Sequence, residues 1–304
     1  RAKACVDYLL DENENNGNTY MHVGDLKKQF DVLVPEAKSN LPLILKGDND
    51  VVFDRELLSV CKKETCETEK YIAERIKEGL QIHTKWDCDC SKFQELDGFK
   101  LTENQCKTSQ YMCENNIVLL VGYGGSGKSS STQAFVNMLN AYNKRHLLLA
   151  PTGRAAKVLS GFTNENAMTI HRGLMYMPPA DWGFNEENKL PYDVVIVDEF
   201  SMVDIFLFRK LLEAIDFEKT KLLLIGDDAQ IPSVGAGNVL YDLLKCEDIP
   251  TITLDKVFRY GKGGLSTVAT DTRTGTEYLD KTKTGMQVFG EDQSYIFMPI
   301  LQDK

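Results

Sequence analysis

The sequence predicts an α/β fold in which a parallel sheet is flanked by helices, preceded by a small α+β module. From about residue 117 onward, short apolar runs typical of buried strands alternate with helical patterns. The first apolar run leads directly into a glycine-rich stretch, as a phosphate-binding strand does. Before residue 68, three helical patterns are followed by two short β-like runs, which is typical of a winged-helix-like module.

Composition limits the class of protein. A chain of 304 residues has room for about two domains, and 42% hydrophobic with 26% charged residues is a normal globular balance. No apolar run approaches the roughly 18 residues of a membrane span, and the N-terminus lacks a signal-peptide hydrophobic region. We therefore expect no membrane partner and a cytoplasmic location. Because the chain starts at Arg1 rather than Met, we expect a fragment or a processed form.

The formal net charge of −10 does not indicate nucleic-acid binding, since a basic face is the usual signature of that function. It does not exclude such binding either. A protein that holds a few phosphates in a groove can do so with local cations and backbone donors.

The N-terminal unit is predicted to span residues 1–68. AKACVDYLLDENEN forms a first helix, TYMHVGDLKKQF a short strand and second helix, EAKSNLPLILKG a third helix, and DNDVVFDRELLSV two β-like runs. Winged-helix-like modules bind DNA or serve as protein-contact or structural domains, and both interpretations stay open.

Residues 69–100 are predicted to connect this unit to the next. ETEKYIAERIKEGLQIH is an amphipathic helix that bridges two domains, with apolar residues at Tyr71, Ile72, Ile76, Leu80 and Ile82. Residues 86–99 are polar and turn-rich, which favours a linker. The nucleotide-binding domain then spans residues 101–304.

Eight cysteines raise the question of a metal site. The set Cys61, Cys66, His83, Cys88 and Cys90 could supply four zinc ligands. The spacings are C-x4-C and C-x-C rather than paired C-x-x-C, so we expect reduced thiols without metal and keep zinc as the alternative.

A helix is predicted to begin within residues 101–116. Thr102 is its N-cap and Gln105 follows three residues later, which fits a capping box. A glutamine about a dozen residues ahead of a phosphate-binding strand can instead hydrogen-bond the adenine edge, because its amide is both donor and acceptor. The position of Gln105 favours the adenine interpretation.

VLLVGYGGSGKSSS, residues 118–131, has the spacing of a P-loop. Glycines let backbone N–H groups approach a triphosphate, Lys128 reaches the β/γ-phosphates, and Ser129 supplies a hydroxyl to Mg²⁺. The following helix directs its positive N-terminal end at the phosphates. The predicted ATP-binding residues in this stretch are Gly122, Gly124, Gly125, Ser126, Gly127, Lys128, Ser129 and Ser130.

Later strands deliver carboxylates and an amide to the same region. RHLLLA is a second strand, and YDVVIVDEFSMVD has the form of a Walker B strand, in which Asp198 holds the Mg²⁺ shell and Glu199 polarises the attacking water. LLLIGDDAQ is a fourth strand, after which Gln230 senses the γ-phosphate or is only a polar loop residue. TITL at 251–254 and SYIFM at 294–298 are predicted as the fifth and sixth strands of the sheet.

Six segments together resemble superfamily 1 helicases, in order and approximate spacing, and most resemble the RecD-like branch, whose members move 5′ to 3′ on single-stranded DNA. These segments are GYGGSGKSS, APTGRAAKVLS, TIHRGL, VVIVDEFSMVD, LIGDDAQIPSVGAGN and LDKVFRYGKGG. The resemblance is specific over residues 101–275. It implies a RecA-like P-loop NTPase domain, and the N-terminal unit more loosely resembles the accessory region that precedes the motor.

The resemblance also implies residue roles. Arg259 matches the arginine that reaches the γ-phosphate, although the family usually has Gln where Tyr260 stands; a surface arginine is the alternative. The other matching nucleotide-site residues are Gln105, Lys128, Ser129, Asp198, Glu199 and Gln230. The segments that hold single-stranded DNA correspond to Pro151, Thr152, Gly153, Arg154, Thr169 and His171, although Arg154 and His171 could instead be surface or structural residues.

The sequence therefore predicts an ATP- and Mg²⁺-dependent DNA helicase, a hydrolase with partners in replication, recombination or DNA repair. We find no second RecA-like motor domain after Arg259, so we expect this chain to bind ATP yet hydrolyse it slowly without the missing arginine finger. An RNA-directed motor of the same superfamily, a non-motor ATPase switch acting on a protein partner, and a binding module with a degenerate ATPase remain the alternatives.

Overall fold

The computed structural model describes residues 1–47, 50–255, 263–283, 285–290 and 293–299. Its N-terminal module contains α1 (Ala2–Asn15), α2 (Val23–Leu33), the 3-10 helix η1 (Pro35–Asn40) and α3 (Leu41–Gly47). Among the described residues, β1 (Met21–His22), β2 (Val51–Asp54) and β3 (Ser59–Lys62) form an antiparallel sheet in the order β1-β3-β2. The module has its own core, built around Val6, Leu26 and Phe30. This is the α+β composition that the sequence predicted.

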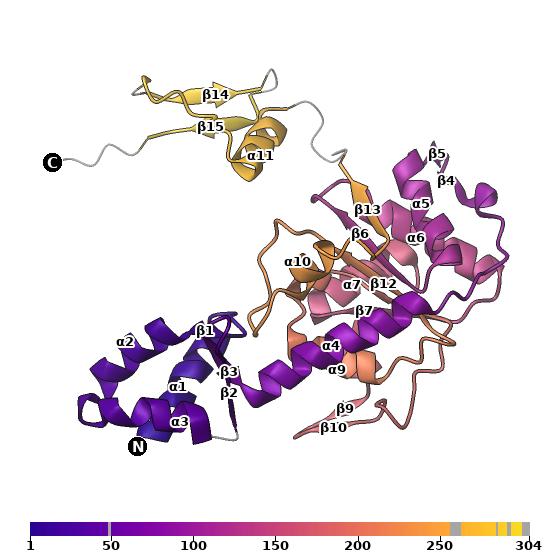
Figure 1. Ribbon diagram of the computed structural model, residues 1–304. Helices are drawn as coiled ribbons and strands as arrows, with labels where there is room; N and C mark the ends of the chain where they lie inside the picture. Colours follow the sequence, from indigo (N-terminus) through magenta and orange to yellow (C-terminus); the bar gives the residue numbers. More distant parts are fainter. Residues whose placement is uncertain (48–49, 256–262, 284, 291–292, 300–304) are drawn as a thin grey trace.

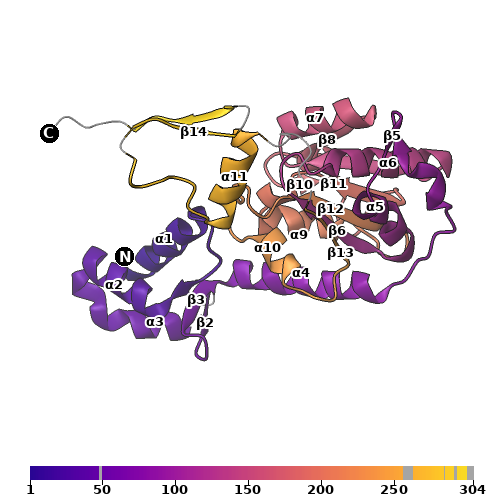
Figure 2. The same ribbon diagram turned by 90° about the horizontal axis from the view of Figure 1, so that it is seen from above.

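Helix α4 (Lys63–Gln81) runs from this module along the next domain, as Figures 1 and 2 show. Its buried face carries Ile72 and Ile76, which join the core beneath the large sheet. The predicted amphipathic bridge is therefore a packed structural helix. The chain beyond it contains the short 3-10 helix η2 (Cys90–Phe93) and a small hairpin of β4 (Glu95–Leu96) and β5 (Phe99–Lys100). Trp86 is only 8% exposed, so residues 86–93 are packed against the domain rather than a free connection.

The large domain is built on a parallel sheet. In the described chain its strands follow the order β13-β6-β12-β11-β7-β8, and each adjacent pair is parallel. The predicted α/β fold is thus confirmed. The strands are β6 (Ile117–Gly122), β7 (His146–Ala150), β8 (Ala167–Thr169), β11 (Val194–Val197), β12 (Lys221–Gly226) and β13 (Thr251–Leu254).

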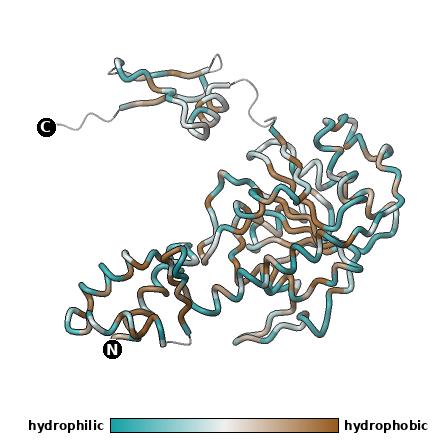
Figure 3. Tube along the Cα trace, in the orientation of Figure 1, coloured by the Kyte–Doolittle hydropathy of each residue, from teal (hydrophilic) through white to brown (hydrophobic). Residues whose placement is uncertain are grey.

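Strand alternation divides the apolar side chains between two cores. Ile117 and Leu119 face one layer with α4, α9 (Ile205–Glu213) and α10 (Val239–Leu244). Val118 and Leu120 face the other layer with α5 (Glu103–Glu114), α6 (Lys128–Ala141) and α7 (Gly153–Thr163). Successive residues of a strand point to opposite faces, so a strand covered on both sides is apolar throughout. Figure 3 shows this as the brown interior of the domain.

One predicted strand was wrong. SYIFM at 294–298 does not join the parallel sheet; its central part is β15 (Tyr295–Phe297), which pairs antiparallel with β14 (Gln287–Phe289) beside α11 (Gly264–Thr274). Both views place this unit outside the sheet (Figures 1 and 2). The remaining strand of the sheet is β8, whose side chains are only half-buried at the edge. Its sequence Ala-Met-Thr therefore lacks the apolar run that marks a central strand.

Within the described residues, no helix combines the length and the apolar character that a membrane span requires.

Candidate nucleotide and nucleic-acid site

The carboxyl ends of the parallel strands bring the predicted site residues to one edge of the sheet. Gly122 ends β6, Asp227 follows β12, and Asp198 follows β11. Since β12 lies between β6 and β11, these three strand ends are neighbours in space although they are far apart in sequence. Open α/β sheets bind their ligands at this edge.

The glycines of the P-loop are needed for different reasons. Gly125 and Gly127 have φ angles of +83° and +95°, which residues other than glycine rarely adopt. A Cβ on Gly122 would lie 2.5 Å from the Ser126 Oγ and 2.7 Å from the carbonyl oxygen of Leu254. Gly124 has open space around the position of a Cβ. Gly122, Gly125 and Gly127 are thus required by the fold, whereas a side chain at Gly124 would meet no other atoms of the loop.

Lys128 begins α6, and its ammonium group lies against the loop. Its Nζ donates to the carbonyl oxygen of Tyr123 at 3.2 Å and also to that of Gly122. The Ser126 hydroxyl is buried and has no hydrogen-bond partner among the described residues. A buried donor without a partner costs free energy, so this hydroxyl is suited to a ligand oxygen. Ser129 and Ser130 occupy the first turn of α6, and Ser129 is exposed.

Asp198 and Glu199 form a strained acidic pair. The Asp198 Oδ1 accepts a hydrogen bond from the Glu199 N–H at 2.9 Å. Burial, then the charge of Glu199, raises the pKa of Asp198 to about 6, and the nearby Lys128 opposes this shift. Glu199 has a φ angle of +52°, and its buried Oε2 has no partner in the described chain. Two carboxylates held this closely are electrostatically suited to a divalent cation.

Gln105 contacts both its own helix cap and the P-loop. The capping box is present: Gln105 Oε1 accepts from the Thr102 N–H at 2.8 Å, and the Gln105 N–H donates to Thr102 Oγ1 at 3.3 Å. In addition, the Gln105 Nε2 donates to the carbonyl oxygen of Gly127 at 3.4 Å. The predicted cap and the predicted proximity to the phosphate loop therefore occur together, and the adenine role stays a prediction.

Gln230 and Arg259 are the remaining residues of the predicted nucleotide site. Gln230 is exposed in the loop after β12, where its backbone N–H donates to the Asp227 carbonyl oxygen at 3.1 Å. Its predicted contact with the γ-phosphate would require this loop to approach a bound nucleotide. Arg259 lies outside the described residues, as does Tyr260.

The two predicted DNA-binding segments lie side by side. Parallel pairing places Ala150 beside Thr169, so the residues after β7 and after β8 leave the same edge of the sheet. Thr152 caps α7 by accepting from the Ala155 N–H at 3.2 Å, and Thr169 caps α8 (Ile170–Gly173) in the same way. Exposed side chains follow each cap; the predicted set is Pro151, Thr152, Gly153, Arg154, Thr169 and His171.

An aromatic cluster next to His171 was missed in the sequence. Tyr176 and Trp182 pair across the hairpin of β9 (Tyr176–Met177) and β10 (Asp181–Trp182). The His171 ring stacks on Trp182 with centroids 5.6 Å apart and meets the edge of Tyr176 at 5.6 Å. The signal for it was two aromatic residues around the Pro178-Pro179 turn. We call the exposed residues after β7 and β8, together with these rings, the strip. The rings add to it a surface on which a base can stack.

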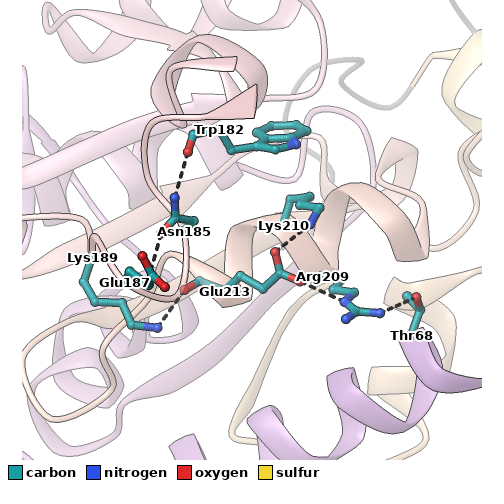
Figure 4. A network of polar contacts seen from close by, with 8 residues as sticks. All are labelled: Thr68, Trp182, Asn185, Glu187, Lys189, Arg209, Lys210 and Glu213. Atoms are coloured by element: carbon teal, nitrogen blue, oxygen red, sulfur yellow. Dashed lines mark hydrogen bonds and ion pairs between the residues drawn. The ribbon is translucent and has the colours of Figure 1, made fainter. Parts of the chain in front are cut away.

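A polar network holds the base of this hairpin (Figure 4). The Asn185 Nδ2 donates to the Trp182 carbonyl oxygen at 2.9 Å. The buried Glu213 of α9 accepts from the Arg209 Nε and from the Lys210 Nζ, each at 2.8 Å. The network also includes Thr68 of α4, whose hydroxyl accepts from Arg209, and Lys189, which donates to the Glu213 carbonyl oxygen. It therefore links the bridge helix, α9 and the segment after β10.

The five residues of the zinc alternative do not lie together. Cys61 lies in β3 and Cys66 in the first turn of α4, whereas His83, Cys88 and Cys90 follow the other end of that helix. A helix of 19 residues is about 28 Å long, which separates the two halves of the set. Over the described ranges, no group of three or more His, Cys, Asp or Glu residues is arranged to hold a metal ion.

Comparison with known proteins identifies relatives of the sheet domain. Residues 100–288 match the model of a family described as AAA domain. The ATP-dependent RecD2 DNA helicase of Deinococcus radiodurans is 37% identical over 159 residues, which are 52% of this chain and 22% of that protein. The RecBCD enzyme subunit RecD of Mycolicibacterium smegmatis is 32% identical over 168 residues, 47% of this chain and 30% of that protein. The predicted resemblance to RecD-like proteins is thus confirmed.

A crystal structure of Pif1 helicase from Candida albicans aligns over 58% of this chain and 44% of that one, with 23% identity and a TM-score of 0.43. The matched segments of the two RecD relatives cover less than a third of those proteins.

Proposed function

The chain belongs to the AAA domain family, and from this we propose that it is the nucleotide-binding motor domain of a RecD-like helicase that moves on single-stranded DNA. One observation supports the proposal: the P-loop, the Asp198–Glu199 pair and the exposed residues that follow β7 and β8 leave the same edge of one parallel sheet. A nucleotide held there lies beside the surface that would hold DNA. Closure of the domain around the nucleotide would then change its affinity for single-stranded DNA.

ATP fits the P-loop on two grounds. The loop presents backbone N–H groups at the N-terminus of a 14-residue helix, and Lys128 supplies a cation next to them. The unpartnered Ser126 hydroxyl offers one more donor inside the loop. Phosphate oxygens would replace the loop carbonyls as partners of the Lys128 ammonium.

Mg²⁺ fits the adjacent carboxylates. Ser129 and Asp198 would hold the ion, which when bound neutralises phosphate charge. Repulsion from Glu199 contributes to the raised pKa of Asp198, and a cation would relieve that repulsion. The unpartnered Oε2 of Glu199 would orient the attacking water and take its proton.

Single-stranded DNA fits the strip between α7 and the β9–β10 hairpin. Arg154 and the backbone N–H groups at the start of α7 would contact phosphates, and the His171, Tyr176 and Trp182 rings would stack on bases. The local character of this strip explains how a chain with a net charge of −10 could hold a polyanion.

The proposal is tested by binding measurements on the chain. We expect Mg²⁺-dependent binding of ATP, and affinity for an oligothymidylate that changes when a non-hydrolysable ATP analogue is added. Lys128→Ala should weaken ATP binding by about 30- to 160-fold, because a charge-assisted contact is worth on the order of 2–3 kcal/mol. Lys157→Ala, on the exposed face of α7, is the control for ATP binding.

An oligouridylate of the same length separates the RNA-directed alternative. Tighter binding of the RNA would favour that alternative. Failure of the folded chain to bind either strand in any nucleotide state would reject the motor function and leave the protein-directed ATPase switch.

A further inference from the structure

Three cysteine thiols gather where residues 86–93 pack on the end of α5. The Cys90 Sγ lies 3.7 Å from the Cys113 Sγ, and the two residues are 23 positions apart in sequence. The thiol of Cys88 is also within hydrogen-bonding reach of Cys113. The Cys90 Sγ lies 3.8 Å from the Met138 Sδ of α6, so the pair is enclosed by sulfur and apolar groups.

Two ammonium groups flank this cluster. The Nζ atoms of Lys144 and Lys221 lie 4.8 Å and 4.9 Å from the centre of the Trp86 ring. Lys221 is buried, and its Nζ donates to the carbonyl oxygens of Cys113 at 3.4 Å and Asn115 at 3.0 Å. Lys144 opposes the rise that burial causes in the pKa of the Cys88 thiol, whereas Asp89 and Glu114, the charges that act on Cys90, raise the pKa of Cys90.

We propose that Cys90 and Cys113 are a redox pair that forms a reversible disulfide, tying the segment before the sheet domain to α5. The two sulfurs are already in contact and need to approach from 3.7 Å to about 2.0 Å. The bond would fasten residues 86–93 to the helix whose other end carries Gln105 and contacts the P-loop. This inference goes beyond the proposed helicase function and does not depend on it.

The two thiols have different roles in the reaction. The hydrogen bond between Cys90 and Cys113, in which either thiol can be the donor, lowers the pKa of Cys90, although burial opposes the shift. The same hydrogen bond and burial raise the pKa of Cys113. Cys90 is half-buried and Cys113 is buried. Cys90 is therefore the attacking thiolate, and Cys113 is the resolving thiol.

With a peroxide as oxidant the steps balance. The Cys90 thiolate attacks one peroxide oxygen, the O–O bond breaks, and Cys90 becomes a sulfenic acid while the other oxygen leaves as water after taking up a proton. The Cys113 sulfur then attacks the Cys90 sulfur and displaces hydroxide, which leaves as a second water with the Cys113 proton. Two thiols and one hydrogen peroxide thus yield one disulfide and two waters. A dithiol reverses the reaction with two electrons and two protons.

The test uses the full 304-residue chain treated with hydrogen peroxide and then alkylated. The chain has eight free cysteines, and we expect the number of alkylated thiols to fall by two. Mass spectrometry of the unreduced digest should identify a peptide pair joined through Cys90 and Cys113. Dithiothreitol should restore both thiols.

Matched variants separate this pair from general oxidation. Cys90→Ser should abolish the cross-link to Cys113, whereas Cys88→Ser and Cys246→Ser should retain it. Circular dichroism establishes that each variant is folded. A folded wild-type chain without the Cys90–Cys113 peptide would overturn the proposal, as would a Cys88–Cys113 link in its place. One equivalent of zinc that protects all three thiols would also overturn it, because the cluster would then be a metal site.

Discussion

At the scale of single residues, the amide of Gln105 connects the N-terminal cap of α5 to the P-loop. Its oxygen completes the capping box with Thr102, and its nitrogen reaches the P-loop at Gly127. An amide oxygen has two lone pairs and the nitrogen carries two hydrogens, so the oxygen can accept one further hydrogen bond and the nitrogen can donate one. The two interpretations of this residue are therefore compatible and need a variant that separates them.

Gln105→Glu is that variant. Glutamate also completes a capping box, so we expect the thermal midpoint to stay within about 2 °C of wild type. The lost N–H donors should lower the ratio of ATP to GTP affinity by up to about tenfold. The ratio is the readout because an added negative charge weakens both nucleotides alike. Gln110→Glu, exposed on the same helix, is the control. An unchanged ratio would leave only the structural role.

Asp198 predicts a specific dependence of stability on pH. Its pKa is about 6 in the folded chain and 3.8 in the unfolded reference. Between these values the folded state binds more protons, so this carboxyl makes the free energy of unfolding decrease as pH rises from about 4 to 6. Asp198→Asn removes the effect and should stabilise the chain at pH 8 by on the order of 1–3 kcal/mol.

Urea unfolding of wild type and Asp198→Asn at pH 5 and pH 8 measures this difference. The gain should be smaller at pH 5, where the wild-type carboxyl is largely protonated. Asp228→Asn, at an exposed position in the loop after β12, is the control. An equal gain at both pH values would show that ionisation of Asp198 is not its cause.

At the scale of elements, the Glu213 network adds polar contacts to the packing of α9 on its neighbours. Its carboxylate neutralises Arg209 and Lys210, and Arg209 also reaches Thr68 on α4 (Figure 4). The side chain of Glu213 is 9% exposed, so solvent screens these contacts weakly. The network therefore connects the bridge helix to the layer beneath the sheet.

Glu213→Ala should lower the free energy of unfolding by about 2–4 kcal/mol, since it leaves two partly buried cations without their partner. Chemical denaturation measures the change. Glu218→Ala, at an exposed position shortly after α9, should change stability by less than about 0.5 kcal/mol. A similar small effect of Glu213→Ala would mean that water replaces the carboxylate at little cost.

At the scale of the whole molecule, charge restricts how DNA can be held. With a formal net charge of −10, the proposed binding of single-stranded DNA would depend on the local groups around Arg154 and Trp182. Phosphate contacts and base stacking respond differently to salt, because only the first releases counterions. The two kinds of contact can thus be distinguished in solution.

We expect the logarithm of single-stranded DNA affinity to fall linearly with the logarithm of salt concentration. Arg154→Ala should reduce the slope by about 0.7, the value for one phosphate contact on a single strand. Trp182→Ala should lower affinity by about 1–3 kcal/mol with the slope unchanged. Lys77→Ala, exposed on α4, is the control. A change of slope in Trp182→Ala would contradict its role as a stacking residue.

Features that depend on local chemistry could be predicted from the sequence. Apolar runs identified the central strands because those strands are buried on both faces, and the glycine spacing identified the P-loop because a close phosphate approach excludes side chains. Asp198 and Glu199 were predicted as site carboxylates because they come directly after a buried strand. Helix caps such as Thr102 depend on residues three positions apart and are likewise visible in the chain.

Contacts between segments that are distant in sequence became visible only in the folded structure. The half-buried edge strand β8 has no apolar run to mark it, and SYIFM has a strand pattern but pairs in a separate hairpin. The stacking of Trp182 on His171 and the contact of Cys90 with Cys113 join residues 11 and 23 positions apart. Such contacts depend on how the layers pack around the sheet, which no local pattern in the sequence encodes.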